Sequence, residues 1–417
     1  MTPPYSLYLH IPFCRHRCAY CDFNTYAGQE ESIPPYVDAL CRELEFIGNN
    51  APGRQTLHTI FFGGGTPSLL TPRQFEAILK TISRYFSLSN PETTIEANPG
   101  TVSLEDLRDL RSLGINRISF GVQSANPSEL RMLERAHTYF DVINAVIWAR
   151  KAGFDNLNLD LIYGLPLQTL EDWSATVKLI LGLAPEHLSL YALTLEHGTP
   201  FGHWSARGLM PLPDPDLAAD MYEWAGETLE TAGYLQYEIS NWAKDNRSTQ
   251  TEDSILSTVH RPPSRACAHN LQYWRGLPYL AAGAGAHGYV NGYRYSNVLR
   301  IKTYIDRLAD SRIPDLKFPL TPATVNHHRQ TLQDNMGEFM MTGLRLTREG
   351  VSPETFRERF GQELDDVFGK EIEDLIRLGL LAWQGSPLPM GEGTRMRVCL
   401  TRRGRLLGNQ AFVRFVG

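Results

Sequence analysis

The first half of the chain alternates short apolar runs with stretches that have the period of an amphipathic helix. The runs are rich in β-formers, and none keeps a clean alternation of apolar and polar positions; they lie at residues 7–11, 57–62, 93–97, 116–122, 156–163 and 187–193. Runs of this kind are typical of parallel strands that are covered on both faces. The pattern therefore predicts six βα units, which make up most of a TIM-like barrel.

Four of the helices that follow these runs begin at capping sequences. Each offers an N-cap oxygen and an acceptor side chain three residues later, and the caps are Thr71, Ser103, Asn126 and Thr169. Two of the four have proline at the first helical position. In a barrel of such units, the active site lies at the carboxyl ends of the strands.

Several candidate binding residues fall at those strand ends. Three glycines at 63–65 follow the second strand, Glu96, Gln123 and Asp160 end the third, fourth and fifth strands, and Arg135 is expected on the helix after the fourth. Taken singly, the glycines are equally consistent with a tight turn, and a charged residue at a strand end is more often a cap or a solvated group. Their coincidence on one rim predicts a ligand site.

Three cysteines follow the first strand directly, at the spacing C-x3-C-x2-C: Cys14, Cys18 and Cys21. A cubane iron-sulfur cluster normally takes four thiolates, so three leave one iron open to a chelating ligand. Zinc is the alternative, with His10 or His16 as a fourth ligand, although zinc sites usually contain C-x2-C pairs. Six cysteines in 417 residues, three of them within eight positions, favour a metal centre in a reducing compartment over disulfides.

The composition is that of an ordinary globular protein, with 42% apolar and 21% charged residues. The length suggests two to three domains. The first residues do not look like a secretory signal, and no apolar run approaches the ~18 residues of a membrane span, so a soluble cytoplasmic protein is expected. A net charge of −6 argues against a broad polyanion-binding surface, so nucleic acid is not an expected partner.

The second half of the chain is less regular. Residues 234–242 (YLQYEISNW) predict another strand, and residues 244–265 then turn polar, with seven Ser or Thr among 22 residues. Such a stretch predicts a flexible insertion. Near the C-terminus the pattern becomes helix, helix, hairpin, with a helix starting at Ser352 and an alternating strand at 396–400. This outline predicts a winged-helix-like domain.

The C-terminal tail is basic, with arginines at 395, 397, 402, 403 and 405. Because no set of aromatic side chains accompanies these arginines, a protein-docking or lid role is favoured over nucleic-acid binding. Residues 283–288 (GAGAHG) fit the pattern G-x-G-x-x-G, but a β-like stretch follows them instead of the helix that a dinucleotide site requires. A turn at a sheet edge, or part of a ligand-site wall, is expected there.

Five segments together resemble the anaerobic coproporphyrinogen III oxidase family of the radical S-adenosylmethionine (SAM) superfamily. They are residues 6–14 (SLYLHIPFC), 63–67 (GGGTP), 95–99 (IEANP), 121–124 (GVQS) and 160–166 (DLIYGLP). The resemblance implies a partial (β/α)6 barrel of the radical SAM type. It also implies that the three cysteines bind a 4Fe-4S cluster, and that the open iron takes the amino and carboxylate groups of SAM.

The same resemblance implies a set of SAM contacts. They are Tyr8, Gly64, Gly65, Thr66, Glu96, Gln123, Arg135 and Asp160. Glu96 and Asp160 also suit this role chemically, because carboxylates accept hydrogen bonds from ribose hydroxyls or an ammonium group and offset a cationic sulfonium.

The chain departs from the decarboxylating oxidases of this family in two ways. Those enzymes have an extension before the first strand and a fourth cysteine two residues after the third, whereas here the printed chain starts just before the strand and that position is Phe23. Both departures resemble the HemW branch, whose members are haem chaperones. Residues 269–274 (HNLQYW) also match the H-N-x-x-Y-W signature of that branch.

The signature implies a haem site at His269, Asn270, Tyr273 and Trp274, with His269 bound to the iron. An imidazole nitrogen can ligate haem iron, and flat aromatic rings can cover the macrocycle. Without the signature, a histidine of this kind more often satisfies local hydrogen bonds. His287 is a second candidate for the iron ligand, and Cys267 a third.

The expected function is therefore that of a haem chaperone that binds SAM, a 4Fe-4S cluster and haem and transfers haem to an acceptor protein, which could be membrane-associated. An electron donor is a further expected partner. Two alternatives stay open: oxidative decarboxylation of coproporphyrinogen III, and radical SAM modification of RNA through the basic tail. Whether SAM is cleaved productively also stays open, and with it whether the protein is an enzyme.

Four regions are expected along the chain. A radical SAM barrel covers residues 1–243, and the flexible insertion covers 244–265. Residues 266–319 form a strand and linker region that completes the core and carries the H-N-x-x-Y-W motif. A winged-helix-like domain of helices and strands covers 320–417.

Overall fold

The computed structural model of the protein describes residues 4–247, 261–309, 316–387 and 394–416. The chain forms two compact units: the first joins Met1–Ala225 to Pro278–Arg329, and the second joins Gly226–Leu277 to Gln330–Gly417. The expected boundaries at 243, 265 and 319 fall inside these units. The expected flexibility of the insertion concerns mainly residues 248–260, which lie outside the described residues.

Ten strands of the first unit follow one another in a single sheet, in the order β14-β13-β12-β11-β1-β4-β5-β6-β7-β8. Two short strands, β2 (Phe13–Cys14) and β3 (Tyr26–Ala27), pair in parallel separately from this sheet. The parallel strands are β11 (Tyr279–Ala282), β1 (Tyr5–Ile11), β4 (Thr56–Gly64), β5 (Ser87–Ala97), β6 (Arg117–Gln123), β7 (Leu157–Tyr163) and β8 (His187–Ala192). The antiparallel extension is β12 (His287–Val290), β13 (Tyr293–Asn297) and β14 (Thr324–Arg329). All six strands predicted for the barrel are present.

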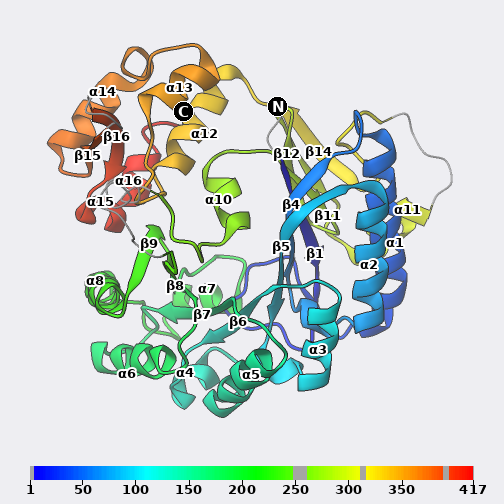
Figure 1. Ribbon diagram of the computed structural model, residues 1–417. Helices are drawn as coiled ribbons and strands as arrows, with labels where there is room; N and C mark the ends of the chain where they lie inside the picture. Colours follow the sequence, from blue (N-terminus) through cyan, green and yellow to red (C-terminus); the bar gives the residue numbers. More distant parts are fainter. Residues whose placement is uncertain (1–3, 248–260, 310–315, 388–393, 417) are drawn as a thin grey trace. The chain divides into compact units, whose positions relative to one another are not determined.

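Helices follow most of the parallel strands, and most of these helices lie along the outer face of the sheet (Figure 1). They are α1 (Ile33–Asn50), α2 (Pro72–Tyr85), α3 (Leu104–Ser112), α4 (Pro127–Met132), α5 (Tyr139–Lys151), α6 (Leu170–Leu181), α7 (Pro200–Ala206) and α11 (Ile301–Ala309), while α8 (Pro215–Thr231) runs from the first unit into the second. Short 3-10 turns also occur: η1 (Glu30–Ser32), η2 (Pro67–Leu69) and η3 (Pro99–Thr101). This confirms the predicted α/β fold, a partial barrel of the TIM type.

The predicted caps begin their helices as expected, with one difference in detail. Thr71, Ser103 and Thr169 each form a complete capping box with the residue three positions on. Asn126 caps α4 by accepting a hydrogen bond from the amide of Ser128, and Glu129 does not reach back. Instead, the Glu129 carboxylate is buried and accepts a hydrogen bond from Ser124 at 2.5 Å. The sequence pattern could not distinguish this buried use of an acidic side chain from a cap.

The strands β11 to β14 are anchored to α1 through one buried carboxylate, that of Glu43. Its two oxygens accept four hydrogen bonds from the segment 283–321: from the Gly283 amide at 2.8 Å, Asn297 Nδ2 at 2.7 Å, the Tyr304 hydroxyl at 2.5 Å and Thr321 Oγ1 at 2.8 Å. Burial raises the pKa of Glu43, and these four donors act in the opposite direction. The carboxylate therefore joins the first helix of the chain to residues more than 200 positions later.

The GAGAHG segment turns between β11 and β12, as the sequence predicted, and no helix follows it. Gly283 and Gly285 have φ values of 109° and 80°, in the region that favours glycine. A side chain at Gly283 would also collide with the His10 carbonyl oxygen, at 2.5 Å from a Cβ atom. The glycines therefore allow this turn to lie against the end of β1.

The second unit begins with a strand pair where one strand was predicted. The stretch 234–242 divides into β9 (Tyr234–Glu238) and β10 (Asn241–Lys244), which pair antiparallel. The predicted single strand was wrong because the chain reverses at Ile239 and Ser240. The helix α10 (Ala268–Trp274) carries the H-N-x-x-Y-W motif within this unit.

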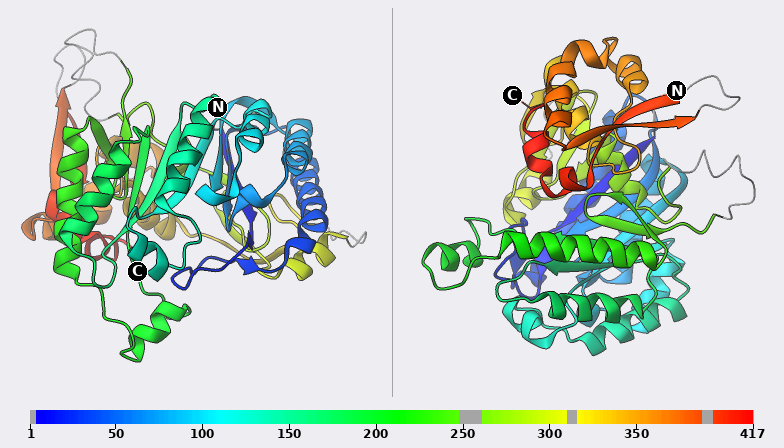
Figure 2. Two further views of the ribbon diagram at one scale, coloured as in Figure 1. Left: turned by 90° about the horizontal axis from the view of Figure 1, so that it is seen from below. Right: turned by 90° about the vertical axis from the view of Figure 1, so that its left-hand side faces the viewer.

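The C-terminal part of the second unit has the predicted order of helices followed by a hairpin. It contains α12 (Leu332–Gly343), α13 (Pro353–Phe360), α14 (Leu364–Arg377), β15 (Leu381–Pro387), β16 (Thr394–Leu400), α15 (Arg402–Leu406) and α16 (Gly408–Phe412). Figure 2 shows β15 and β16 side by side, and they pair antiparallel. Gly361 ends α13 in a left-handed conformation, with φ at 70°. The hydrophobic core of this C-terminal part includes four phenylalanines: Phe339, Phe356, Phe368 and Phe415.

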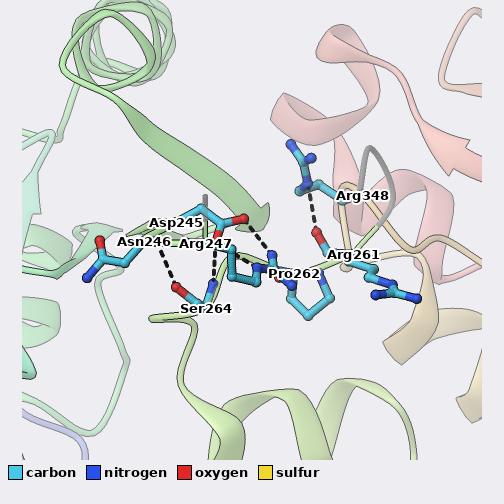
Figure 3. A network of polar contacts seen from close by, with 7 residues as sticks. All are labelled: Asp245, Asn246, Arg247, Arg261, Pro262, Ser264 and Arg348. Atoms are coloured by element: carbon cyan, nitrogen blue, oxygen red, sulfur yellow. Dashed lines mark hydrogen bonds and ion pairs between the residues drawn. The ribbon is translucent and has the colours of Figure 1, made fainter. Parts of the chain in front are cut away.

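The two ends of the polar insertion are tied together at its base (Figure 3). Asp245 accepts two hydrogen bonds from the Arg247 guanidinium, at 2.7 and 2.5 Å, and one from the Ser264 amide at 3.3 Å. Arg247 also donates to the Pro262 carbonyl at 2.7 Å, and Arg348 donates to the Arg261 carbonyl at 3.2 Å. The segments on either side of residues 248–260 are therefore fixed to each other within the second unit. Among the described residues, no helix combines the length and the apolar character needed to cross a bilayer.

The first prediction concerns the buried Glu43. The change Glu43→Gln keeps the side-chain volume but replaces one acceptor oxygen with a donor, so two of the four buried donors lose their acceptor. Since each unsatisfied buried group costs about 1–3 kcal/mol, we expect the free energy of unfolding of the first unit to fall by about 2–4 kcal/mol. Urea denaturation followed by circular dichroism measures this loss.

Asp38→Asn provides the matched control, because Asp38 is exposed on the same helix. Its unfolding free energy should stay within about 0.5 kcal/mol of the parent protein. An equal loss in both variants would show that the Glu43 hydrogen bonds do not stabilise the fold.

Candidate functional site

The cysteine loop leaves the carboxyl end of β1 and is held by segments from both halves of the chain. After Cys14 the chain turns, and the Cys18 carbonyl accepts a hydrogen bond from the Cys21 amide at 3.1 Å. Farther along, Asn24 Nδ2 donates to the carbonyls of Ala284 and Leu299, at 3.0 and 3.1 Å. The loop is therefore fixed at both ends. Its three cysteines form no disulfide bond, and their side chains are partly exposed.

The two histidines considered as zinc ligands are engaged elsewhere. Both ring nitrogens of His10 have partners: Nδ1 lies 3.0 Å from the Tyr8 hydroxyl, and Nε2 lies 2.9 Å from the Asn24 carbonyl. Nε2 of His16 lies 2.9 Å from the Glu134 carboxylate. Within the described ranges, no three His, Cys, Asp or Glu side chains gather around the position of a single metal ion. A cluster of several irons needs its thiolates farther apart than one tetrahedral ion does.

Two of the loop cysteines receive hydrogen bonds from outside the loop. Thr66 Oγ1 donates to Cys14 Sγ at 3.6 Å, and Arg135 Nη1 donates to Cys18 Sγ at 3.8 Å. Burial raises the pKa of Cys14, and the hydrogen bond from Thr66 acts in the opposite direction. Burial also raises the pKa of Cys21, against hydrogen bonds from Phe23 and Thr25. Donors aimed at sulfur favour the thiolate form that binds iron.

The glycine segment lies against this loop and against Glu96. The Gly64 amide donates to the Glu96 carboxylate at 3.0 Å, which joins the ends of the neighbouring strands β4 and β5. Gly64 has a φ of 116°, and a Cβ atom there would lie 2.5 Å from the His10 ring. At Gly65 a Cβ atom would lie 2.6 Å from the Phe13 carbonyl and 3.1 Å from Cys14 Sγ. The glycines thus allow the backbone of β4 to approach the cysteine loop closely.

Gln123 and Arg135 lie at the carboxyl end of β6. Gln123 ends the strand with a φ of 68°, an unfavourable conformation for a residue with a side chain. Arg135 was expected on a helix, but it lies in the loop between α4 and α5, and that expectation was wrong. Its Nη2 atom donates to the Gly121 carbonyl at 2.6 Å and to Asn98 Oδ1. The loop brings the guanidinium back over the strand end, next to Cys18.

Asp160 lies three residues before the end of β7, not at the strand end as predicted. Its carboxylate accepts hydrogen bonds from Ser119 Oγ at 2.9 Å and from Asn158 Nδ2 at 2.7 Å. Asn158 also donates to Ser119 Oγ at 2.7 Å, and its Oδ1 lies 2.6 Å from His187 Nδ1. These polar side chains connect β6, β7 and β8 on the inner face of the sheet.

The inner face carries two partly buried carboxylates, Glu96 and Asp160, close enough to interact electrostatically. Burial, followed by the negative charge of Asp160, raises the pKa of Glu96 to about 7, while the Gly64 amide and the Arg117 charge act in the opposite direction. Burial also raises the pKa of Asp160, against hydrogen bonds from Ser119, Ser189 and Asn158. A cationic ligand placed between the strand ends would offset this repulsion.

Most predicted contact residues therefore lie around one end of the first unit. Two of them lie within strands, Tyr8 in β1 and Asp160 in β7. The others come from the ends of β4, β5 and β6 and from the adjoining loops: Gly64, Gly65, Thr66, Glu96, Gln123 and Arg135. Four further residues connect these contacts by hydrogen bonds and were not predicted from the sequence: Asn98, Ser119, Asn158 and His187. Their signal was the alternation of polar residues along strands, as in Asn158 and Asp160, which the overall apolar character of these runs concealed.

In the second unit, α10 brings the H-N-x-x-Y-W residues onto one short helix. His269 is buried, and its Nε2 atom lies 2.8 Å from the Tyr273 hydroxyl, one helical turn later. The two rings meet edge to face with centroids 5.0 Å apart. Asn270 Nδ2 donates to the Tyr237 hydroxyl at 3.4 Å. The helix therefore holds His269 and Tyr273 as a pair and attaches Asn270 to β9.

Trp274 is held by the C-terminal part of the second unit. The Arg345 guanidinium lies 4.3 Å from the centroid of a Trp274 ring and 3.8 Å from the buried Glu238 carboxylate. The indole Nε1 of Trp274 is buried and has no hydrogen-bond partner among the described residues. The neighbouring Arg275 forms a two-point ion pair with Glu349, at 2.7 and 3.0 Å. Arginine stacking and ion pairing thus attach the end of α10 to the residues around α12.

The other iron-ligand candidates lie elsewhere. His287 is exposed at the start of β12, in the first unit. Cys267 is buried directly before α10, and its amide donates to the Tyr237 hydroxyl at 3.3 Å.

Several arginines of the basic tail have partners inside the second unit. Arg405 donates to Gln236 Oε1 at 2.7 Å, and Arg397 donates to the Glu349 carbonyl at 3.1 Å. Arg402 lies 3.5 Å from the Glu227 carboxylate. These contacts fit a structural role for the three side chains, and they partly neutralise the tail.

Comparison with protein families matches two parts of the chain. The radical SAM superfamily matches residues 8–180, and the HemN C-terminal domain matches residues 330–389. The first match covers the cysteine loop and the strands β1 to β7. The second covers α12, α13, α14 and β15.

Individual relatives match the whole chain. The heme chaperone HemW of Bacillus subtilis is 38% identical over 415 residues, which cover 99% of both chains. The heme chaperone HemW of Lactococcus lactis is 35% identical and covers 100% of this chain and 98% of its own. Among solved structures, coproporphyrinogen III oxidase (HemN) from Escherichia coli, a radical SAM enzyme, matches with a TM-score of 0.79 at 24% identity, over 99% of this chain and 90% of that one. At this identity the likeness shows a shared fold.

The second prediction concerns the charge of Glu96. Because its pKa is raised to about 7, the carboxylate gains its charge as the pH rises through that value. A cationic ligand such as SAM should therefore bind about tenfold more tightly at about pH 8 than at about pH 6. Equilibrium dialysis of SAM with the protein at both pH values measures this ratio.

Glu96→Gln removes the titrating group and keeps the side-chain size. We expect weaker SAM binding in this variant and an affinity that changes little between the two pH values. If the SAM affinity of Glu96→Gln still changed about tenfold between the two pH values, the change would arise from the ligand or from another protein group.

Proposed function

The chain belongs to the HemW family of the radical SAM superfamily, and on this basis we propose that it is a haem chaperone, which binds haem and transfers it to an acceptor protein. The full-length identity to proteins of this name is the observation that carries the proposal. We propose further that the first unit holds a 4Fe-4S cluster and SAM, and that the second unit holds haem.

Cys14, Cys18 and Cys21 are the proposed ligands of the cluster. The loop fits this role in three respects: the thiols are free, the loop is anchored at Asn24, and two sulfurs already receive hydrogen bonds. Gly65 leaves room beside Cys14, since a Cβ atom there would approach the sulfur to 3.1 Å. When bound, the cluster supplies one-electron chemistry and an open iron site.

SAM is the proposed ligand of the strand ends next to this loop. The Arg135 guanidinium is suited to a carboxylate, and the partly buried Glu96 and Asp160 carboxylates are suited to a cation or to hydroxyls. The amides of Gly64 and Gly65 already donate to Glu96 and to the Ile11 carbonyl, so these glycines would contribute close backbone approach and not free donors. Burial raises the pKa of Glu96, and the repulsion from Asp160 raises it further; this shift is the structural feature that best supports a cationic ligand there. The Tyr8 hydroxyl lies next to His10 in the same region.

Haem is the proposed ligand of the α10 region, with His269 as the iron ligand. Ligation through Nε2 would replace the hydrogen bond from this atom to Tyr273. Tyr273 and Trp274 would supply flat apolar surface next to the ligated histidine. Arg345 and Glu349 attach the end of α10 to the rest of the second unit, so we assign the proposed haem site to this unit.

Decarboxylation of coproporphyrinogen III is the competing enzyme function. In the oxidases that this chain resembles, a fourth cysteine stands two residues after the third, and here that position is the exposed Phe23. Anaerobic turnover of coproporphyrinogen III by protein with an intact, reduced cluster would favour the oxidase over the chaperone. We expect no turnover.

The third prediction tests the cluster. Cys18→Ala removes one of three thiolates, so we expect the iron and sulfide content after anaerobic reconstitution to fall severalfold and the visible absorption of the cluster to be lost. Cys41→Ala, which removes a partly buried thiol from α1, is the control and should keep its full iron content. Unchanged iron and sulfide in Cys18→Ala would contradict the assignment of the cluster to this loop.

The fourth prediction tests the haem site. An anaerobic haem titration of the cluster-reconstituted protein, followed by Soret absorbance, should saturate near one haem per chain. His269→Ala should weaken haem binding about tenfold or more and alter the Soret band, because the axial nitrogen is lost, while the iron-sulfur content stays the same.

Tyr273→Phe is a sharper control than a distant substitution. It keeps the aromatic ring but removes the hydroxyl that holds His269 Nε2, so haem should bind at least as tightly as in the parent protein. Equal binding by His269→Ala and the parent would make His269 a structural residue. The His287→Ala and Cys267→Ala variants would then locate the iron ligand.

A further inference from the structure

Asn98 lies between the two hydrogen-bond donors that point at the cluster cysteines. It follows the last residue of β5 and precedes Pro99. Its side-chain amide contacts Thr66 on one side and Arg135 on the other: Nδ2 lies 3.0 Å from Thr66 Oγ1, and Oδ1 accepts a hydrogen bond from Arg135 Nη2. Thr66 in turn contacts Cys14, and Arg135 contacts Cys18.

The backbone of Asn98 is fixed independently of these contacts. Its carbonyl accepts hydrogen bonds from the amide and the hydroxyl of Thr101, at 3.0 and 2.7 Å. The following proline restricts its backbone to the extended conformation that it has, with φ −90° and ψ 138°. The amide group is therefore presented at a defined place between the donors.

The chemistry of the groups sets the direction of the hydrogen bonds that run from Arg135 through Asn98 and Thr66 to Cys14. A guanidinium can only donate, so the amide oxygen of Asn98 must face Arg135. The amide nitrogen then faces Thr66 and donates to its hydroxyl oxygen. Because a hydroxyl has one proton, and Thr66 here accepts from Asn98, that proton is free to point at Cys14 Sγ. One amide thus directs both donors toward sulfur.

We propose that Asn98 is a positioning residue that aligns Thr66 and Arg135 as donors to the cluster thiolates and thereby raises the reduction potential of the cluster. Hydrogen bonds to cluster sulfurs are one of the factors that set the potential, because they stabilise the more negative reduced form. The inference rests on the proposed cluster at Cys14, Cys18 and Cys21. It assigns a role to a residue that contacts neither iron nor sulfur.

The test is an anaerobic redox titration of the reconstituted protein without SAM, followed by the electron paramagnetic resonance signal of the reduced cluster. Asn98→Ala should keep the iron and sulfide content of the parent protein and shift the midpoint potential to a more negative value. At a fixed poise the ratio of reduced to oxidised cluster should fall about threefold to tenfold, and tenfold corresponds to 59 mV for one electron.

Two further variants separate positioning from general damage to the site. Thr66→Val removes the donor to Cys14 while Asn98 stays in place, and it should shift the potential in the same direction. In the Thr66→Val background, Asn98→Ala should shift the potential by less than it does alone, since one of the two donors it aligns is already missing. Ser68→Ala is the matched control: Ser68 lies 2.6 Å from Thr101 Oγ1 in the same region and contacts no cysteine.

An unchanged potential in Asn98→Ala with a complete cluster would overturn the inference, as would fully additive shifts in the double variant or an equal shift in Ser68→Ala. Asn98→Asp is the fallback if the alanine variant does not hold a cluster: the carboxylate draws the Thr66 proton away from Cys14, so a more negative potential is expected. Absence of iron from the parent protein would instead refute the proposed cluster itself.

Discussion

The position of β1 within the sheet is the constraint on which the rest of the structure depends. This strand pairs in parallel with β4 on one side and with β11 on the other, although β11 lies about 270 positions later in the sequence. Leu7, Leu9 and Ile11 are fully buried on one face of the strand, and the polar Ser6 and His10 are buried on the other, so a one-residue shift would exchange apolar and polar side chains between the two faces. Because the cysteine loop continues directly from β1, its location is fixed by both halves of the chain.

The hydrogen bonds that anchor the strands from β11 to β14 also fix the location of the cysteine loop. Glu43 holds the turn after β11 through the Gly283 amide, and the next amide, that of Ala284, donates to the Tyr36 hydroxyl at 2.8 Å. Tyr36 itself donates to the His10 carbonyl at 2.7 Å, at the end of β1. Asn24 then connects the far end of the loop to the same turn. A buried carboxylate outside the cysteine loop therefore supports the site through a series of hydrogen bonds.

The inner face of the sheet shows a second constraint, which is the satisfaction of buried polar groups. Asn158 uses its amide to join Ser119, Asp160 and His187 on three strands. Without such partners, these side chains would carry a large desolvation cost in the interior. Even so, the pKa of Glu96 and that of Asp160 remain raised, so the site keeps an uncompensated preference for positive charge. Asn158 and its partners therefore satisfy one another by hydrogen bonds, whereas the carboxylates of Glu96 and Asp160, the proposed SAM contacts, are held at a cost that a cation would reduce.

The strands, most caps and the helix-and-hairpin C-terminal region could be predicted from the sequence, because periodicity and capping are local properties. The division of residues 234–242 into two strands could not be predicted, because the chain reverses at Ile239 and Ser240 without the glycine or proline that is typical of a turn. Arg135 was placed on a helix because its neighbours have helical character, whereas the loop position depends on contacts with Gly121 and Asn98. Asn98 itself was quoted only within a motif, because its role depends on two residues from other strands and loops.

The hydrogen bonds of Arg135 also limit how the site can use this residue. A guanidinium has five N–H groups, and three are occupied by Cys18, Asn98 and Gly121. Its Nε atom is buried and has no partner among the described residues. Arg135 also makes a side-chain hydrogen bond with Tyr20, so not both of the remaining N–H groups are available to an anionic ligand such as a carboxylate. In the proposed function, this side chain would contact both a cluster thiolate at Cys18 and a bound carboxylate, and it would join the electronic state of the proposed cluster to the occupancy of the neighbouring site.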